Sequence, residues 1–390
     1  MRARLNEPPD RIELPAGFTA AGLHCGLKAA GALDLGLLLA AAPTSVAAIF
    51  SDTSLLGAHI HVCRDHLEQS GGQARAILVN ARNANCSTGQ RGVDDAYACC
   101  AALAARLGCP TEQVLMASTG VIGSPLPRAK ILDHLGPLVD AADEDGGMDF
   151  ARAIMTTDTQ PKARSAAGAA RVTGFAKGSG MIHPDMATML GFLLTDGTPA
   201  GSTLVAALGD VADQSFHRVT VDGDTSPNDS LFLMAGGGAA VPRDQLQDVA
   251  VDLAMEVAAD GEGASRLITV EVRGAPDAAA AARVGRTIAT SPLVKTAVAG
   301  RDPNWGRVVA AAGRSGVPFD PGAARVWVGD VEVFAAGAPL PEREAAASAH
   351  LQQQERVVLG IALGAGDASA DVWTCDLTAD YVRINADYRT

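Results

Sequence analysis

The sequence predicts a protein of the α/β or α+β class that is built from several layers. Short apolar runs alternate with alanine-rich stretches of helical periodicity along all 390 residues, which indicates strands interleaved with helices. Hydrophobic residues make up 48% of the chain and charged residues 19%, a composition typical of a folded core and not of a disordered chain. The length suffices for two ordinary domains or one large layered unit.

The first predicted strands lie in the N-terminal third. Residues 35–42, 45–50 and 76–80 are short apolar runs bounded by glycine, proline or aspartate, as buried strands are. Another strand is expected over residues 114–117. His59 and His61 alternate as neighbours in a strand would, and a structural role is favoured over metal binding for this pair.

Helices follow between the strands. Residues 94–107 begin with aspartate, repeat apolar residues every three to four positions and end before Gly108 and Pro110. Residues 202–211 and 244–260 show the same pattern, whereas residues 189–194 and 267–272 are further strand candidates. Two segments rich in turn residues, 177–184 and 300–306, are predicted loops.

Composition excludes several functional classes. With 31 lysines and arginines against 44 aspartates and glutamates, the net charge is −13, which disfavours broad electrostatic binding to nucleic acid or an anionic membrane. The seven cysteines include no CxxC pair and no grouping with histidine at zinc spacing, so free thiols in a reducing cytoplasm and no metal are expected. No apolar stretch fits a signal peptide or a membrane span, and we therefore expect a cytoplasmic protein.

The common catalytic motifs are absent. The chain has no GxxxxGK[ST] phosphate loop, no HExxH and no GxSxG, and residues 178–180 form half of a dinucleotide fingerprint that precedes a strand instead of a helix. On propensity alone, Thr188 is an ordinary β-branched strand residue. Composition and spacing therefore do not find the active site.

Six sequence blocks change this interpretation. They are ASTGVIG at 117–123, MTTD at 155–158, KGSGM at 177–181 with MATML at 186–190, DGEGA at 260–264, DPNWGR at 302–307 and NADYRT at 385–390. In these blocks and in their order the sequence resembles the ornithine acetyltransferase family, the self-cleaving glutamate N-acetyltransferases of arginine biosynthesis. Arg82, where a small residue is expected, and Pro227, where threonine is usual, depart from the family pattern outside the catalytic blocks.

The resemblance implies the family's layered α/β/β/α sandwich and its self-cleavage. The cut is expected between Ala187 and Thr188, which gives an α chain of residues 1–187 and a β chain of residues 188–390. Both chains are expected to contribute to one active site and to pair into an (αβ)₂ heterotetramer. Cleavage leaves Thr188 with a free α-amine, which can act as general base for its own hydroxyl.

The reaction implied by the resemblance is a ping-pong transfer. Thr188 takes the acetyl group of N2-acetyl-L-ornithine as an acyl-enzyme and passes it to L-glutamate. Thr119 and Gly120 are the expected oxyanion hole, as a hydroxyl and a backbone N–H. No cofactor is expected, and the sequence leaves open whether acetyl-CoA is a second acetyl donor. The substrate-binding residues implied are Thr157, Lys177, Thr188, Glu262, Asn385 and Thr390, with Thr156 a nearly equal candidate to Thr157.

Two alternatives belong to other classes. A self-cleaving amidohydrolase or aminopeptidase with an N-terminal threonine would pass the acyl group to water, whereas a pocket with Lys177 and Glu262 suits two amino-acid substrates and favours transfer. A non-catalytic metabolite-binding protein is disfavoured because Thr188, Thr119 and Gly120 are intact. The sequence does not distinguish an enzyme of arginine synthesis from one of a specialised pathway that uses the same chemistry.

Overall fold

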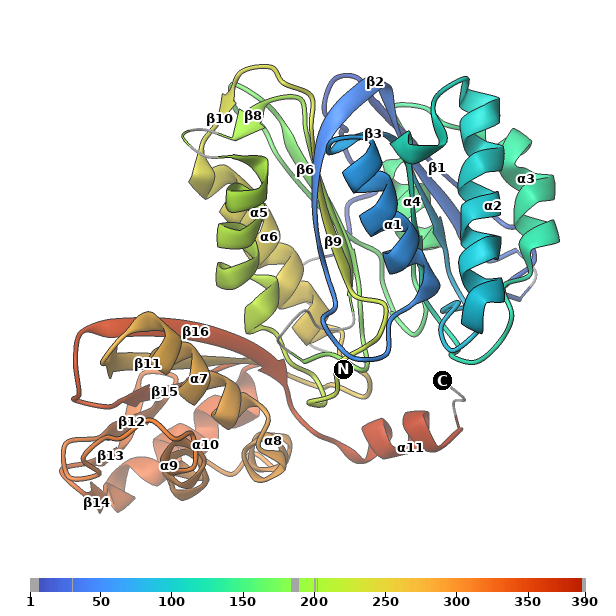
Figure 1. Ribbon diagram of the computed structural model, residues 1–390. Helices are drawn as coiled ribbons and strands as arrows, with labels where there is room; N and C mark the ends of the chain where they lie inside the picture. The colour runs from blue at the N-terminus through green and yellow to red at the C-terminus, as the bar shows by residue number, and fades with distance from the viewer. Residues whose placement is uncertain (1–6, 30, 184–188, 200, 202, 388–390) are drawn as a thin grey trace.

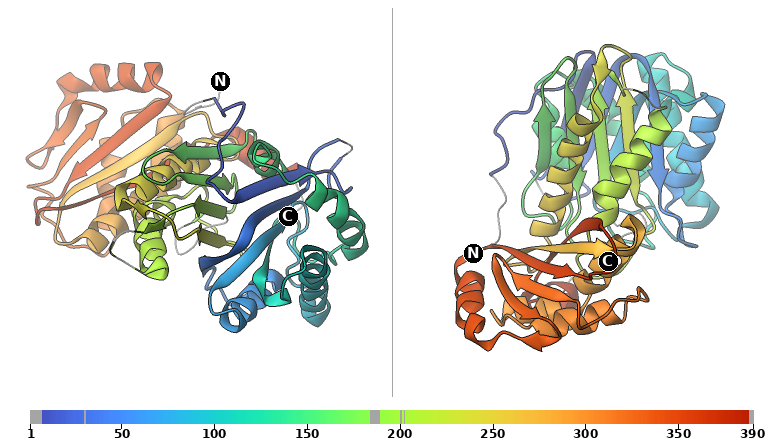
Figure 2. Two further views of the ribbon diagram at one scale, coloured as in Figure 1. Left: turned by 90° about the horizontal axis from the view of Figure 1, so that it is seen from above. Right: turned by 90° about the vertical axis from the view of Figure 1, so that its left-hand side faces the viewer.

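The computed structural model describes residues 7–29, 31–183, 189–199, 201 and 203–387, which form two lobes (Figure 1). The first lobe contains an eight-stranded sheet and the second a six-stranded sheet. Both further views show the second lobe as a separate body against one end of the first (Figure 2). The C-terminal helix α11 (Ala379–Asp387) leaves the second lobe and lies beneath the first.

The first lobe alternates strands with helices, as the sequence predicts. The strands of its sheet are β1 (Phe18–Leu23), β2 (Leu35–Phe50), β3 (Gln73–Asn80), β4 (Val114–Ser118), β5 (Lys162–Ala166), β6 (Val172–Lys177), β7 (Leu190–Thr195) and β9 (Ser230–Ala235). Its helices are α1 (Ala58–Gln69), α2 (Gly89–Leu107), α3 (Arg128–Asp140), α4 (Gly147–Ala153), α5 (Leu204–Gln214) and α6 (Arg243–Ala259). The short strands β8 (Thr198–Pro199) and β10 (Ala240–Val241) pair with each other.

The long strand β2 divides the eight-stranded sheet into two facing halves. The strand order is β4-β3-β2-β9-β7-β6-β5, with β1 also on β2. The first part of β2 pairs with β1 and β3, and only Ser45 to Phe50 pairs with β9. The register with β3 shifts between Leu39 and Thr44, where β2 changes partners and bends.

The inner faces of the two halves share one core. Leu38 and Leu115 from one half belong to the same apolar cluster as Phe192 and Phe232 from the other. The rings of Phe192 and Phe232 stack with centroids 5.6 Å apart, and Phe150 of α4 meets Phe192 edge-on at 5.2 Å. Helices α2 and α3 cover one outer face, and α5 and α6 cover the other. The expected α/β/β/α layering is confirmed.

The second lobe packs helices on one face of its sheet. Its strands are β11 (Leu267–Ala275), β12 (Arg325–Val328), β13 (Val331–Ala335), β14 (Ala338–Pro339), β15 (Arg356–Ala362) and β16 (Ala368–Cys375), and its helices are α7 (Ala278–Ala289), α8 (Pro292–Ala299), α9 (Trp305–Gly313) and α10 (Glu344–Gln353). Buried Lys295 of α8 joins the lobes, because its Nζ donates to the Val221 carbonyl of the first lobe at 2.7 Å and to Thr374 Oγ1 at 2.8 Å.

Most predicted elements are present, with three differences. The two strands predicted around Pro43 are the single strand β2, in which Pro43 is exposed at the point where pairing with β3 is interrupted, so its missing N–H costs no ladder bond. The helix predicted from residue 94 begins at Gly89. The predicted loop at 300–306 ends in helix α9, which Asn304 caps by accepting from the Arg307 N–H.

The alternation of His59 and His61, which fits neighbours in a strand, has another origin, because both residues lie on helix α1. His59 is fully buried, and its Nε2 lies 3.1 Å from the Ser230 hydroxyl at the start of β9. Burial lowers the pKa of His59 to about 3, so the ring is neutral at physiological pH. Its structural role is thus that of a core residue. Within the described ranges, no helix is long and apolar enough to span a bilayer.

Candidate active site

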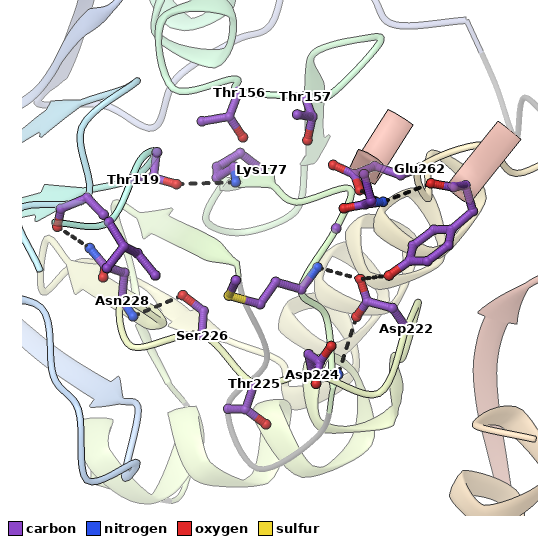
Figure 3. A pocket seen from close by; sticks show the side chains of 17 residues that line it. Thr119, Thr156, Thr157, Lys177, Asp222, Asp224, Thr225, Ser226, Asn228 and Glu262 are labelled. Atoms are coloured by element: carbon purple, nitrogen blue, oxygen red, sulfur yellow. Dashed lines mark hydrogen bonds between the residues drawn. The ribbon is translucent and has the colours of Figure 1, made fainter. Parts of the chain in front are cut away.

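A cavity of about 380 Å³ opens at the end of the first lobe that faces α11. Several connecting segments converge there: those after β3, β4, β6 and α6, and those before β5 and β9. Helix α11 contributes a further side, although it is separated from these segments by more than a hundred residues in sequence. Thr119, Gly120, Thr157, Lys177, Glu262 and Asn385, which the sequence predicts as site residues, all line this one cavity (Figure 3).

Thr119 and Gly120 follow β4 directly. Thr119 is 5% exposed, and its Oγ1 accepts a hydrogen bond from the Nζ of Lys177 at 3.3 Å. Its own hydroxyl hydrogen therefore remains available to a ligand. Gly120 has φ +134°, and among the described residues none accepts from its backbone N–H. This pair can thus supply two donors to the cavity.

The turn before α2 explains why Gly120 is a glycine. A Cβ at Gly120 would lie 2.2 Å from the backbone carbon of Arg82, so the two turns could not approach as they do. Arg82 itself has φ +73°, a left-handed conformation that favours glycine. The small residue expected at this position would suit this backbone conformation, and the arginine side chain is exposed.

Lys177 ends β6 and is buried beside the cavity. The residue is only 3% exposed, and this burial lowers its pKa, while the carboxylates of Asp158, Asp229 and Glu262 act in the opposite direction. A buried ammonium that retains only a hydroxyl as described hydrogen-bond partner is suited to bind a substrate carboxylate.

The two adjacent threonines differ in their partners. Thr156 donates to Asp158 Oδ2 from its backbone N–H at 2.9 Å and from its hydroxyl at 3.5 Å. Thr157 also lines the cavity, and no described residue bonds to its hydroxyl. Thr157 is therefore the better placed of the two for a substrate contact.

Glu262 and Asn385 meet across the lobes. The Nδ2 of Asn385, on α11, donates to Glu262 Oε2 at 2.8 Å. The carboxylate of Glu262 also lies against Gly180, where an added Cβ would be 2.4 Å from Oε2. The glycine in the segment 177–181 thus lets the acidic side chain reach the cavity, and α11 fixes its orientation.

The turn before β9 carries residues that sequence reasoning missed. Asp222 accepts from the backbone N–H groups of Met181 at 2.6 Å and Ile182 at 2.9 Å, and burial raises its pKa. The hydroxyl of Tyr381, on α11, lies 3.4 Å from the same carboxylate. Asn228 donates to the carbonyls of Ala84 and Ser118, the latter at 2.7 Å, and so joins the two sheet halves. The acidic and small residues of segment 222–229 are the sequence feature that could have indicated a site here.

Asp229 lies next to the predicted cleavage region. Its Oδ1 accepts from the backbone N–H of Met189 at 3.1 Å, and Oδ2 has no partner among the described residues. Burial raises the pKa of Asp229 well above its usual range. Ala187, Thr188 and Thr390, three further predicted site residues, lie outside the described residues.

The chain is similar to known proteins along nearly its whole length. Residues 19–390 match the sequence profile of the ArgJ family. The arginine biosynthesis bifunctional protein ArgJ of Prochlorococcus marinus (strain MIT 9313) is 45% identical over 97% of this chain and 93% of its own length. The ArgJ protein of Symbiobacterium thermophilum is 44% identical over 97% of this chain and 98% of its own.

Solved structures resemble parts of the chain. The crystal structure of the arginine biosynthesis bifunctional protein argJ from Bacillus halodurans matches with 38% identity and a TM-score of 0.50, over 52% of this chain and all of that chain. A structure of the Mycobacterium tuberculosis ornithine acetyltransferase complexed with ornithine matches with 30% identity and a TM-score of 0.40, over 47% of this chain and 97% of that chain.

Proposed function

The chain belongs to the ArgJ family, and we propose that it acts in arginine biosynthesis as an acyltransferase that moves the acetyl group of N2-acetyl-L-ornithine to L-glutamate. The observation that carries this proposal is the cavity that gathers Thr119, Gly120, Lys177 and Glu262. Met189, the residue after Thr188 in sequence, donates its backbone N–H to Asp229, which follows the cavity-lining Asn228.

The precursor first cleaves itself between Ala187 and Thr188. The hydroxyl of Thr188 attacks the preceding carbonyl, and water resolves the resulting ester to leave a free α-amine on Thr188. The B. halodurans chain, matched over its whole length by 52% of this chain, has about the length of the fragment expected from residues 188–390, which supports the cut.

Transfer then proceeds in two half-reactions. The α-amine, with an intrinsic pKa of about 8, takes the proton of the Thr188 hydroxyl as the oxygen attacks the acetyl carbonyl. The Thr119 hydroxyl and the Gly120 N–H stabilise the oxyanion, and the proton passes to the leaving amine of ornithine. Glutamate enters, its α-amine attacks the acetyl ester, and Thr188 is regenerated.

The charges around the cavity suit both amino acids. The buried ammonium of Lys177 binds the α-carboxylate that donor and acceptor share, with Thr157 beside it. Glu262, oriented by Asn385, contacts the ammonium group of ornithine. Thr390 is the remaining proposed contact at the C-terminus. Whether acetyl-CoA is an alternative donor is decided by the assay described below.

The expected assembly and location rest on the same resemblance. We expect the α and β chains to remain together and to pair into an (αβ)₂ unit, without nucleic acid or membrane. All seven cysteines are free and six are buried, which is consistent with a reducing cytoplasm.

The proposal is tested by incubating the purified protein with N-acetylornithine in the presence and absence of glutamate. A transferase releases ornithine continuously only when glutamate is present and forms N-acetylglutamate in equal amount. Equal ornithine release with and without glutamate would instead identify the amidohydrolase alternative. Repeating the assay with acetyl-CoA as donor separates a bifunctional from a monofunctional enzyme.

A further inference from the structure

One buried lysine lies beneath the proposed substrate pocket and joins the segments that form it. Lys162, at the start of β5, is 1% exposed, and its Nζ lies 2.7 Å from Asp158 Oδ1 and 2.7 Å from Asp260 Oδ2. Asp158 directly follows Thr157, and Asp260 precedes Glu262 by two residues. Lys162 therefore links the segment that carries Thr157 to the segment that carries Glu262.

The third segment, which follows Lys177, is bonded to both aspartates. Asp158 Oδ1 accepts from the backbone N–H of Gly178 at 2.7 Å. The hydroxyl of Ser179 donates to the backbone carbonyl of Asp260 at 2.7 Å, and the Glu262 N–H donates to the Ser179 carbonyl at 2.8 Å. The segments that carry the proposed contacts of Thr157, Lys177 and Glu262 to the substrate are thus all anchored to this cluster.

The cluster is arranged to stay ionised and rigid. Although burial opposes ionisation of Asp158, the neighbouring ammonium groups of Lys162 and Lys177 hold the pKa of its carboxyl below the usual range. Removing one member would leave a buried charge without its partner, so alternative arrangements are disfavoured. None of the three side chains lines the cavity, so they act on the substrate only through their neighbours.

We propose that Lys162, Asp158 and Asp260 are positioning residues that set the distance between the carboxylate-binding Lys177 and the ammonium-binding Glu262, and thereby select the length of the donor amino acid. This inference rests on the proposed acetyl transfer from N-acetylornithine at this site. It gives a physical role to the aspartates of the blocks MTTD and DGEGA, in which the proposed reaction uses only Thr157 and Glu262.

The consequence is a length-dependent donor preference. Nα-acetyl-L-lysine carries the same charged groups as N2-acetyl-L-ornithine but is one methylene longer. In a pocket with a fixed distance between its charged ends, one methylene changes kcat/KM by roughly 10- to 200-fold. If the cluster is loosened, the segments can separate and the longer donor is accepted more readily.

The test compares kcat/KM for the two donors in Lys162→Met and Asp260→Asn. We expect the ornithine-over-lysine preference to fall by about 5-fold or more in Lys162→Met and to fall less in Asp260→Asn, which keeps the side chain's size and most of its hydrogen bonds. The ratio is independent of how much enzyme is folded, because misfolding lowers both values equally. Asp260→Asn provides the measurement if Lys162→Met does not fold.

The matched control is Arg164→Met on the same strand. Arg164 forms an ion pair with Glu256 of α6, one helical turn before Asp260, and neither residue lines the cavity. This variant should lose thermal stability and keep the wild-type ratio. If both cluster variants still transfer acetyl groups and keep the wild-type ratio of kcat/KM for the two donors, the positioning role is overturned but the proposed function is not. A wild-type protein without glutamate-dependent release would overturn the proposed function as well.

Discussion

Thr119 combines two features expected of an oxyanion-hole donor. It lies in the cavity immediately after a buried strand, which fixes its position, and its backbone N–H donates to the Asn80 carbonyl at 3.0 Å. Its oxygen accepts from the Lys177 ammonium, which polarises the hydroxyl and leaves its hydrogen for the substrate.

Thr119→Ala should lower kcat by roughly 100-fold or more and change KM little, because the lost donor acts on the transition state. Thr119→Ser keeps the hydroxyl and should retain most activity. Steady-state kinetics on folded, cleaved protein measures both. Wild-type turnover by the alanine variant would remove Thr119 from the mechanism and leave the charge to Gly120 or an unassigned group.

Lys177 should give the reaction an alkaline limit in KM. An ammonium binds a carboxylate only below its pKa, and burial lowers the pKa of Lys177, so binding is lost as pH rises through a value below that of an ordinary lysine. The α-amine of Thr188 must be neutral to act as base, so it raises kcat with pH and does not mask this effect.

Lys177→Met should raise KM for N-acetylornithine by about 10- to 100-fold, as expected for loss of a charged hydrogen bond, and should abolish the alkaline increase in KM. KM is measured between neutral pH and the highest pH at which both proteins stay folded. A variant whose KM still rises in parallel with that of the wild type would assign the titration to another group.

At the scale of elements, helix α1 contacts the sheet through a neutral histidine. His59 has a folded-state pKa of about 3 and an unfolded-state pKa near the usual 6.5, so the unfolded chain binds the extra proton between these values. The contribution of His59 to stability is therefore complete above pH 6.5 and declines as pH falls below it. Asp158, whose pKa is lowered, acts only at more acidic pH.

His59→Gln should be less stable than the wild type at pH 7 but should lose less stability between pH 7 and pH 5. The slope for one histidine is about 1.4 kcal/mol per pH unit below 6.5, so the difference between the two proteins should narrow by roughly 2 kcal/mol. Urea unfolding at both pH values measures it. Equal losses in the two proteins would show that His59 is not the titrating group.

Local patterns predicted the elements, and local exceptions explain the differences. Helices such as α6 and strands such as β7 carry their own periodicity and end signals. The spacing of His59 and His61 is ambiguous because two polar residues separated by one apolar residue fit both a strand and the first turn of a helix. Pro43 led to the prediction of two strands instead of one. A proline is accommodated within β2 because β3 does not pair with it there, and only the folded sheet determines where that pairing stops.

The active site could not be derived in the same way. Its lining residues range from Ala84 to Asn385, and no local period relates a turn after β4 to a helix at the C-terminus. Family resemblance supplied those positions, and the structure brings six of them together. Asp222, Asp229 and Tyr381 escaped notice because their roles depend on burial and on backbone groups of distant segments.

At the scale of the whole molecule, the proposed fragments are interleaved within one sheet. Strand β7, from the second fragment, pairs with β6 of the first, and β9 of the second pairs with β2 of the first. The apolar core between the sheet halves also draws on both fragments. Separation would expose this core to water, which is strongly unfavourable.

The cleaved protein should therefore elute as one species without denaturant and separate only when unfolded. Light scattering after size exclusion should give about twice the 39.7 kDa of one chain for the (αβ)₂ unit. A mass near one chain would contradict the pairing but not the cleavage. If the two fragments eluted as separate peaks without denaturant, the shared sheet would not be what holds them together.

The most direct test of the account is intact and peptide mass spectrometry of the protein after incubation with N-acetylornithine in the absence of glutamate. We predict a fragment that begins at Thr188 and carries one acetyl group on that residue, which disappears when glutamate is added. Thr188→Ala should stay uncut and unacetylated. A wild-type protein found only as the full chain, or acetylated at a residue other than Thr188, would contradict the central claim.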